Sequence, residues 1–228
     1  EKAAVIEKGS FVVSSEQSTT VRKIINDRVK RIGACINWVE PLNESWELGL
    51  TGNFQKHNAA VALKVAQLLI ERGWRIRQED IRKGLALTKW PGRLEIIDFE
   101  NKKILIDSAH NGSAAKALSI ERENWLNQDK GVYWIIGVQK QKNIILIIKN
   151  LIKPIDKVLL VPVPNQESWS LSDISKIPDL KLDNFIEFSN FKEAFNYLKN
   201  LKEWPSCLPV LTGSIFLVSE FIKYSKTS

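Results

Sequence analysis

Residues 107–111, Asp-Ser-Ala-His-Asn, bring a carboxylate, an imidazole and an amide together within a short stretch. They follow an almost entirely apolar run at 103–107, which is typical of a strand covered on both faces, and a predicted helix comes next. In an open α/β sheet, ligands bind outside the carboxyl ends of the strands. This position favours ligand contact for Asp107, His110 and Asn111, and His110 is one of only two histidines in the chain.

Each of these side chains also has a structural interpretation. Asp107 could accept hydrogen bonds from ribose hydroxyls, the role that acidic residues play in dinucleotide folds, or it could satisfy amides at the start of the helix. His110 and Asn111 could contact a phosphate or a substrate carboxylate near the helix N-terminus, which favours anions. The alternative for His110 is a hydrogen-bonded histidine with a structural role.

Three further positions combine a polar side chain with a turn or a helix start. Arg93 follows a rigid Pro-Gly turn and suits bidentate contact with phosphate oxygens, unless it is only a surface arginine at a strand end. Asn58 lies where a strongly periodic helix starts and could pair with an adenine edge, although Asn58 or His57 could equally cap that helix. Ser214 opens the last helix, where its hydroxyl and the backbone amides could hold a carboxylate or simply form the N-cap.

Strands and helices alternate in the second part of the chain, which predicts an α/β fold with a mostly parallel sheet and helices on both sides. The predicted strands are 93–99, 103–108, 132–138, 157–163, 184–188 and 208–212. The predicted helices are 113–127, 143–151, 190–201 and 214–225. A Pro-Gly break after Trp90 sets the predicted boundary between two domains, 1–88 and 89–228.

The first part of the chain predicts long helices and a few short strands. The expected strands are 10–15, 35–39 and 46–50, and the expected helices are 19–32, 59–70 and 78–87. Apolar residues recur at helical spacing in these helices. Gly73 follows the second helix, as a glycine at a helix C-terminus does.

The first two strands of the second part should form a hairpin, because about three polar residues join them and a parallel crossover needs many more. With the turn centred near Asn101, Arg93 lies opposite Ala109. Its guanidinium then reaches the neighbourhood of Asp107 and His110. The register therefore predicts one cluster of a cation, a carboxylate and an imidazole.

The formal net charge of +7 suits an anionic partner, but the chain has no Lys/Arg run of the kind that binds nucleic acid. A phosphate-bearing small molecule or a poly-acidic substrate fits the charge as well. The longest apolar stretch, 143–149, is far short of the roughly 20 residues needed to span a bilayer, and no signal-peptide pattern opens the chain. We expect no nucleic-acid partner, no membrane partner and a cytoplasmic location.

Cys35 and Cys207 lie far apart without metal-binding spacing, so both are predicted to be reduced core thiols. The chain contains no methionine and starts in what reads as the inside of a protein, so we expect a fragment. It contains no G-x-x-x-x-G-K-[ST] phosphate loop, no Gly-rich dinucleotide fingerprint and no Ser-His-Asp arrangement. If the protein uses ATP, the loop that cradles the phosphates lies elsewhere.

Five blocks of this sequence, in this order, resemble the C-terminal half of folylpolyglutamate synthase/dihydrofolate synthase, in the Mur ligase superfamily. Residues 1–9 resemble the family pattern E-K-A-G-I-I-K-x-G, and residues 50–59 resemble L-x-G-x-[FH]-Q-x-x-N-A. Residues 90–95 resemble W-P-G-R-[LF]-E. Residues 107–111 and 211–214 resemble D-G-A-H-N-P and the terminal T-G-S. Each block is weak alone, but together they span nearly the whole chain.

The resemblance implies the end of a central ATPase domain over 1–88 and a whole C-terminal, Rossmann-like domain over 89–228. It also implies an ATP-dependent amide ligase. ATP phosphorylates a carboxylate of the pterin substrate or of its glutamate tail, and the amine of L-glutamate attacks the acyl phosphate. Such chemistry needs neutralisation of the triphosphate and alignment of two anionic substrates.

The implied partners are small molecules: ATP, L-glutamate, and folate or dihydropteroate. Mg²⁺ and a second, monovalent cation are the implied cofactors, and the implied oligomeric state is a monomer. By position, the resemblance implies that Asn58 contacts adenine, Arg93 binds ATP phosphate and Asp107 binds the ribose hydroxyls. His110 would lie near the γ-phosphate or the reacting carboxylate.

Three other residues receive roles from the resemblance. Asn111 would support His110 at the glutamate site, and Ser214 would help hold the incoming glutamate. Lys2 matches the family lysine that becomes carbamylated and serves a magnesium site, since carbamylation turns a cation into an anion. His110 and Lys2 are thus the implied catalytic residues.

Ser108 replaces the family's usual Gly, and Gly112 replaces its Pro, so these departures bear on the orientation of His110. The family's phosphate loop, folate-binding region and magnesium-binding His and Glu all precede the first residue. We therefore expect that the 228-residue chain alone cannot catalyse ligation. One alternative is a non-catalytic nucleotide-binding module. The other is a different Mur-type amide ligase, against which residues 54–55, Phe-Gln, argue because those ligases usually carry His-Asn there.

Overall fold

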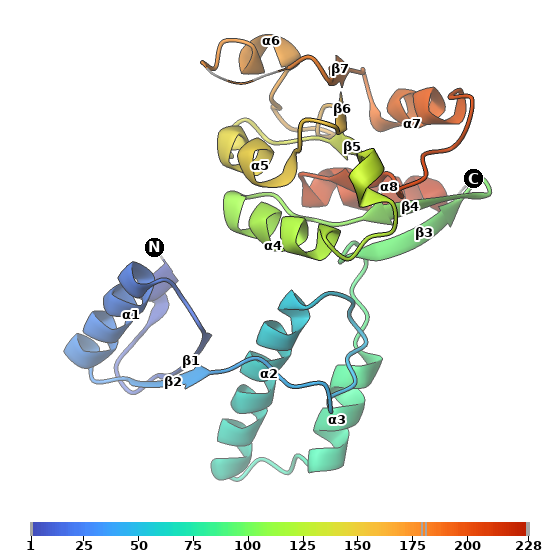
Figure 1. Cartoon of the computed structure of the whole chain (residues 1–228). Coiled ribbons are helices and arrows are strands. Elements are labelled where there is room, and N and C mark those ends of the chain that lie inside the picture. The colour runs from blue at the N-terminus through green and yellow to red at the C-terminus, as the bar shows by residue number, and fades with distance from the viewer. Residues whose placement is uncertain (1, 179, 181, 227–228) are drawn as a thin grey trace. The chain divides into compact units, whose positions relative to one another are not determined.

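The chain forms two compact units, Glu1–Lys89 and Trp90–Ser228, in a computed structural model that describes residues 2–178, 180 and 182–226 (Figure 1). Each unit has its own β-sheet. Glu1, the first residue of the block at 1–9, lies outside the described residues. No helix in the described ranges is long and apolar enough to cross a membrane.

The first unit is built on a two-stranded parallel sheet. Its elements are η1 (Lys2–Val5), β1 (Phe11–Ser15), α1 (Thr19–Ile32), β2 (Cys35–Val39), α2 (Phe54–Glu71) and α3 (Gln78–Leu87). The Ser18 hydroxyl accepts a hydrogen bond from the Val21 amide at the start of α1, and Gly33 ends that helix in the left-handed conformation. α1, β2 and α3 have the predicted bounds.

Two expectations for the sequence outside the helices are wrong. The strand predicted at 46–50 is absent, because this stretch forms bends and irregular backbone. Its Gly49 approaches the end of α3 so closely that a Cβ would lie 2.4 Å from the Thr88 carbonyl oxygen. Cys35 is exposed rather than part of a core, whereas Cys207 in the second unit is buried, and both thiols are free.

α2 begins earlier than the periodicity of its apolar residues predicts. Asn53 is its N-cap residue, so His57 and Asn58 lie inside the helix. The capping alternative for His57 and Asn58 is therefore wrong, and Asn58 presents its side chain from the first turns of a helix.

The second unit holds a six-stranded sheet in the order β3-β4-β8-β5-β6-β7. All neighbouring strands run parallel except β3 and β4, which form an antiparallel hairpin. The strands are β3 (Glu95–Phe99), β4 (Lys102–Ile106), β5 (Tyr133–Ile136), β6 (Lys157–Leu160), β7 (Phe185–Glu187) and β8 (Val210–Thr212). The helices are α4 (Gly112–Arg122), η2 (Gln128–Lys130), α5 (Ile144–Leu151), α6 (Leu171–Ile174), α7 (Phe191–Lys199) and α8 (Ile215–Ser225). The predicted α/β fold, with a mostly parallel sheet that starts with a hairpin, is confirmed.

Successive residues of these strands point to opposite faces of the sheet, and each face has its own apolar core. On one face, Leu105, Trp134 and Leu160 pack with α4 and α5. On the other face, Ile104 and Ile135 pack with α7 and α8. Figure 1 shows α4 and α5 on one side of this sheet and α7 on the other. Coverage on both faces explains why the inner strands are continuous apolar runs in the sequence.

The hairpin turn consists of Glu100 and Asn101, both with positive φ, as in the two-residue turns whose twist matches that of the strands. Continuing the ladder beyond β3 and β4 sets Arg93 opposite Ser108. The predicted pairing with Ala109 is therefore wrong by one residue, because the turn is centred between Glu100 and Asn101 rather than on Asn101.

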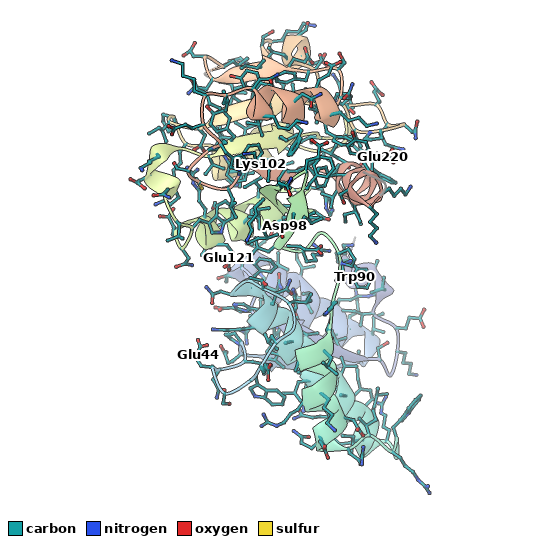
Figure 2. All side chains as sticks on the ribbon, turned by 90° about the vertical axis from the view of Figure 1, so that its right-hand side faces the viewer. Glu44, Trp90, Asp98, Lys102, Glu121 and Glu220 are labelled. Carbon is teal, nitrogen blue, oxygen red and sulfur yellow. The ribbon has the colours of Figure 1, made fainter. Side chains whose placement is uncertain are left out.

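The hairpin forms one edge of the sheet, since β3 has no strand on its outer side among the described residues. Figure 2 labels Asp98 on β3 and Lys102 on β4, with Trp90 at the start of the second unit. Asp98 is exposed, and the Lys102 ammonium lies 5.6 Å from the centroid of the Trp204 ring. Charged residues on an edge strand oppose pairing with another chain.

A buried ion pair connects α4 to the start of β6. Arg122 and Asp156 are both fully buried and are joined by two hydrogen bonds of 2.6 and 2.7 Å. Asp156 also accepts hydrogen bonds from the amides of Val132 and Lys153 and from the indole of Trp134. Because Asp156 bonds Val132 and Trp134 near the start of β5, this cluster holds together the amino ends of β5 and β6. Removing either Arg122 or Asp156 would leave a buried charge unpaired.

Candidate active site

The carboxyl ends of β4, β8 and β5 meet at one place on the sheet edge. The Gly213 amide after β8 donates to the Ala109 carbonyl oxygen after β4 over 2.9 Å, and the Gly137 amide after β5 donates to the Thr212 carbonyl oxygen over 3.2 Å. β8 lies between β4 and β5, but α8 and α4 pack on opposite faces of the sheet. Open α/β sheets bind ligands outside the strand ends at such a change of side.

Gly213 allows these strand ends to approach so closely. Its φ is +101°, and a Cβ would lie 2.6 Å from the Gly137 carbonyl oxygen. Glycine is the residue that meets both demands without displacing the neighbouring backbone. The turn through Gly213 thereby fixes the place at which Ser214 starts α8.

Asp107 lies directly after β4 and is 4% exposed. Its Oδ2 accepts the Leu94 amide over 3.0 Å, and its Oδ1 accepts the Ala109 amide over 2.8 Å. Burial raises the pKa of this carboxyl, and the two amides and the charges of Arg93 and His110 offset the rise only in part. Because Asp107 bonds the amides of Leu94 and Ala109, the segments that carry Arg93 and His110 meet at this carboxylate.

His110 is oriented by a hydrogen bond within its own loop. Its Nδ1 lies 2.8 Å from the Ser108 carbonyl oxygen. Because a carbonyl oxygen can only accept, Nδ1 carries a proton, and Nε2 is the unprotonated nitrogen of the neutral ring. The structural bond expected as an alternative is thus present, and it leaves Nε2 of the neutral ring to accept a proton. Only the protonated ring can donate a hydrogen bond to an anion.

Arg93 stands between two residues with positive φ, Gly92 at +72° and Leu94 at +47°. Positive φ at a leucine costs on the order of 1–3 kcal/mol, so the surrounding contacts must hold this segment. The Gly92 amide donates to Glu95 Oε2 over 2.8 Å. The Gly92 carbonyl oxygen accepts the amide and the hydroxyl of Ser108, both over 2.9 Å. Arg93 is therefore a half-buried residue on a fixed segment rather than an isolated surface arginine.

Asn111 and Ser214 are the N-caps of α4 and α8. Asn111 Oδ1 accepts the Ala114 amide over 2.9 Å, and Ser214 Oγ accepts the Phe216 amide over 3.2 Å. The N-cap alternative for Ser214 is thus realised, and Asn111 forms a cap that was not predicted from the sequence. The same caps bring two helix N-termini to the edge of the sheet that holds Asp107, and helix N-termini favour anions.

Lys2 and Asn58 belong to the first unit. Asn58 is exposed on α2, and its Nδ2 donates to Oε1 of the buried Gln55 over 2.9 Å. An amide has two donor hydrogens and an acceptor oxygen, so this bond orients Asn58 without using all of its hydrogen-bonding groups. Lys2 is exposed in η1. No three His, Cys, Asp or Glu side chains gather as a metal-binding group within the described ranges.

The structure adds residues that the sequence reasoning did not select. Ser108 bonds both Gly92 and His110, and Gln55 orients Asn58. Their only signals in the sequence are a serine where the resembled pattern has glycine, and the three-residue spacing of Gln55 and Asn58 on one helix face.

Lys140 follows β5 at the carboxyl edge of the sheet, and nothing in the sequence marked it as a residue of this region. Its ammonium pairs with Asp173 over 2.5 Å and lies 4.5 Å from the centroid of the Trp169 ring. Hydrogen bonds from Lys140 and Ser170 hold the pKa of Asp173 well below its usual range. Lys140 therefore has a partner in α6.

Residues 93–224 match the model of the family described as dihydrofolate synthetase, C-terminal domain. The chain belongs to this family. The matched range starts at Arg93 and includes Asp107, His110, Asn111 and Ser214.

Comparison with individual proteins agrees with this assignment. The chain is 25% identical over 235 residues to the dihydrofolate synthase/folylpolyglutamate synthase of Buchnera aphidicola subsp. Schizaphis graminum, covering 97% of this chain and 54% of that protein. It is 26% identical over 257 residues to the dihydrofolate synthetase of Saccharomyces cerevisiae, covering 98% and 59%. The folylpolyglutamate synthase of Mycobacterium tuberculosis, solved with ADP and AMPPCP, shares the fold with a TM-score of 0.78 at 19% identity, covering 98% and 57%. The chain thus spans about half the length of these relatives.

Proposed function

We propose that this chain is part of an ATP-dependent ligase that joins L-glutamate to dihydropteroate, to folate polyglutamates or to both, through an acyl phosphate. The observation that carries the proposal is the cluster of Arg93, Asp107 and His110 at the carboxyl edge of a sheet in a member of this family. In this proposal, residues 1–88 form the end of a central ATP-binding domain and 89–228 form the glutamate-ligase domain of a cytoplasmic enzyme.

ATP supplies the phosphoryl group that activates a carboxylate, and the residues of this chain bind and orient the reactants. The planar Arg93 guanidinium suits contact with two phosphate oxygens at once and neutralises their charge. The neutral His110 ring accepts a proton at Nε2, and the protonated ring donates to a phosphate or carboxylate oxygen. The fixed backbone around Arg93 supports this role, because a preorganised cation needs little rearrangement as charge develops.

Asp107 is the proposed acceptor for ribose hydroxyls. Each of its oxygens already accepts one amide but has a second lone pair, so the carboxylate can still accept a hydroxyl. Because only 4% of the residue is exposed, the ribose must approach the strand end closely. Asn58, oriented by Gln55 on the first unit, is the proposed adenine contact.

The incoming glutamate is proposed to bind near the N-termini of α4 and α8. The Ser214 hydroxyl accepts an amide hydrogen bond and keeps its own proton, which it can donate to a carboxylate. Asn111 caps α4 through Oδ1, so its Nδ2 is the group proposed to contact the substrate or support His110. A carbamylated Lys2 would contribute a carboxylate-like ligand toward Mg²⁺.

The test is ATP-dependent attachment of labelled glutamate to dihydropteroate and to folate by the intact gene product that contains this sequence. Arg93→Ala should lower kcat/KM about 100- to 1000-fold, the usual loss on removing a group that stabilises developing charge. Lys103→Ala removes a cation from the exposed amino end of β4 and should retain activity. The 228-residue chain alone is expected to be inactive in the same assay.

Three outcomes would contradict the proposal. Ligation of a different amino acid to a different carboxylate would indicate another Mur-type ligase. ATP binding without ligation by the intact protein would indicate a nucleotide-binding module. Equal losses of kcat/KM in Arg93→Ala and Lys103→Ala would show that the activity does not depend on the proposed site.

A further inference from the structure

Every polar group of Ser108 bonds a residue of the candidate site. Its amide and its hydroxyl donate to the Gly92 carbonyl oxygen, each over 2.9 Å. Its carbonyl oxygen accepts from His110 Nδ1 over 2.8 Å. The residue is 3% exposed, so water does not compete effectively for these bonds. Ser108 therefore connects the segment that carries Arg93 to the ring of His110.

Gly92 is held from both sides. Its amide donates to Glu95 Oε2 over 2.8 Å, while its carbonyl oxygen receives the two bonds from Ser108. Its φ is +72°, and a Cβ there would lie 2.5 Å from Val218 Cγ1 and 3.1 Å from the Ser108 hydroxyl. The dihedral angles of Gly92 set the direction in which Arg93 leaves the turn, so Glu95 and Ser108 together constrain Arg93.

We propose that Ser108 is a positioning residue for Arg93 and His110, with Glu95 as its counterpart on the other side of Gly92. The inference rests on the proposed function, in which Arg93 binds phosphate. A guanidinium that is already held in place loses less conformational freedom on binding, so the hydroxyl strengthens nucleotide binding without touching the nucleotide. The pattern that residues 107–111 resemble has glycine at this position, and the serine of this chain adds the hydroxyl bond.

The first test measures the order of the Arg93 side chain in the 228-residue chain by NMR relaxation of its Nε–Hε group. Ser108→Ala and Ser108→Gly should both lower the order parameter, and glycine is the residue that the family pattern already tolerates. Ser175→Ala is the matched control, because it removes a hydroxyl that donates to the Ser172 carbonyl oxygen away from the site. Unchanged order of Arg93 in both Ser108 variants would overturn the proposal.

The counterpart residue supplies an independent variant pair. Glu95→Ala removes the acceptor of the Gly92 amide and should also lower the order of Arg93. Glu95→Gln keeps an acceptor oxygen and should restore it. Equal order in the two Glu95 variants would show that this hydrogen bond does not position Arg93, and would contradict the role of Glu95.

The second test uses the steady-state kinetics of the intact gene product. Ser108→Ala should raise KM for ATP about three- to tenfold, the equivalent of one neutral hydrogen bond, while kcat changes by less than about twofold. In an Arg93→Ala background the same substitution should have no further effect, whereas a structural defect would lower activity in both backgrounds and overturn the proposal. If the intact protein ligates no glutamate, the proposed function fails, and the order of Arg93 still decides the inference.

Discussion

Replacing Gly213 with alanine should destabilise the second unit through two separate effects. Its φ of +101° lies in a region that costs an L side chain about 1–3 kcal/mol. The added Cβ would also lie 2.6 Å from the Gly137 carbonyl oxygen, a backbone atom that cannot rotate away. Displacing that backbone adds an overpacking cost of about 1–3 kcal/mol, so we expect a loss of about 2–6 kcal/mol in the free energy of unfolding.

Gly131→Ala is the matched control for this variant. Gly131 has a φ of +89°, and its Cβ would lie 2.6 Å from the Ile155 carbonyl oxygen, but it precedes β5 at the opposite edge of the sheet. Both variants should lower the melting temperature of the second unit by about 7–20 °C, measured by circular dichroism. Below that temperature, only Gly213→Ala should weaken ATP binding. A Gly213→Ala protein that melts at the wild-type temperature would refute the reasoning, as would equal loss of binding in both variants.

Three further perturbations test the second unit and its site. Asp156→Ala should cost about 3–5 kcal/mol in urea denaturation, because it leaves the fully buried Arg122 unpaired; a loss below about 1 kcal/mol would contradict that account. Burial raises the pKa of Asp107, so the folded state holds this proton more strongly than the unfolded chain. The stabilisation of the folded state that comes from binding this proton is present below the unfolded pKa of about 3.9. It is lost as pH rises through the folded pKa of Asp107. Relative to Asp107→Asn, the free energy of unfolding should therefore fall as pH rises above about 4, and parallel pH profiles would count against the raised pKa. Asn111→Ala removes the α4 cap and should cost about 0.5–2 kcal/mol, whereas an unchanged urea midpoint would show that the cap contributes nothing.

The α/β fold could be predicted because its signals are local and repeated. Apolar runs covered on both faces, helical periodicity and short polar joins give the strands, the helices and the hairpin without knowledge of distant contacts. The strand prediction at 46–50 failed because its alternating apolar residues resemble a strand, while the close approach of Gly49 to the end of α3 holds the stretch in an irregular loop. The predicted strand register was wrong by one residue because the sequence alone did not give the length of the turn. The positive φ angles of Glu100 and Asn101 allow a turn of only two residues.

Contacts between distant side chains could not be predicted. Arg122 and Asp156 lie 34 residues apart, and no local pattern marks them as partners. In the sequence, Ser108 differs from the resembled pattern only by being serine instead of glycine. Its bond to Gly92 forms because the hairpin brings the segment before β3 next to the segment after β4. Local sequence thus indicates which residues stand at the strand ends, whereas the contacts that fix them depend on the assembled sheet.

The central claim is that nucleotide binds at the carboxyl edge of the second sheet. It is tested most directly by titrating the isotopically labelled 228-residue chain with ATP and Mg²⁺ and following the NMR spectrum. Arg93→Ala should weaken binding about tenfold or more, the loss expected for hydrogen bonds to a charged group, whereas Lys103→Ala should leave it unchanged.

The account predicts that the amides of Leu94, Ala109 and Gly213 shift together with the side chain of Arg93, because all four belong to the same edge of the sheet. The amide of Val132, at the opposite edge, should not move. Spectra that stay unchanged at this edge up to saturating ATP, or shifts confined to the neighbourhood of Val132, would contradict the account.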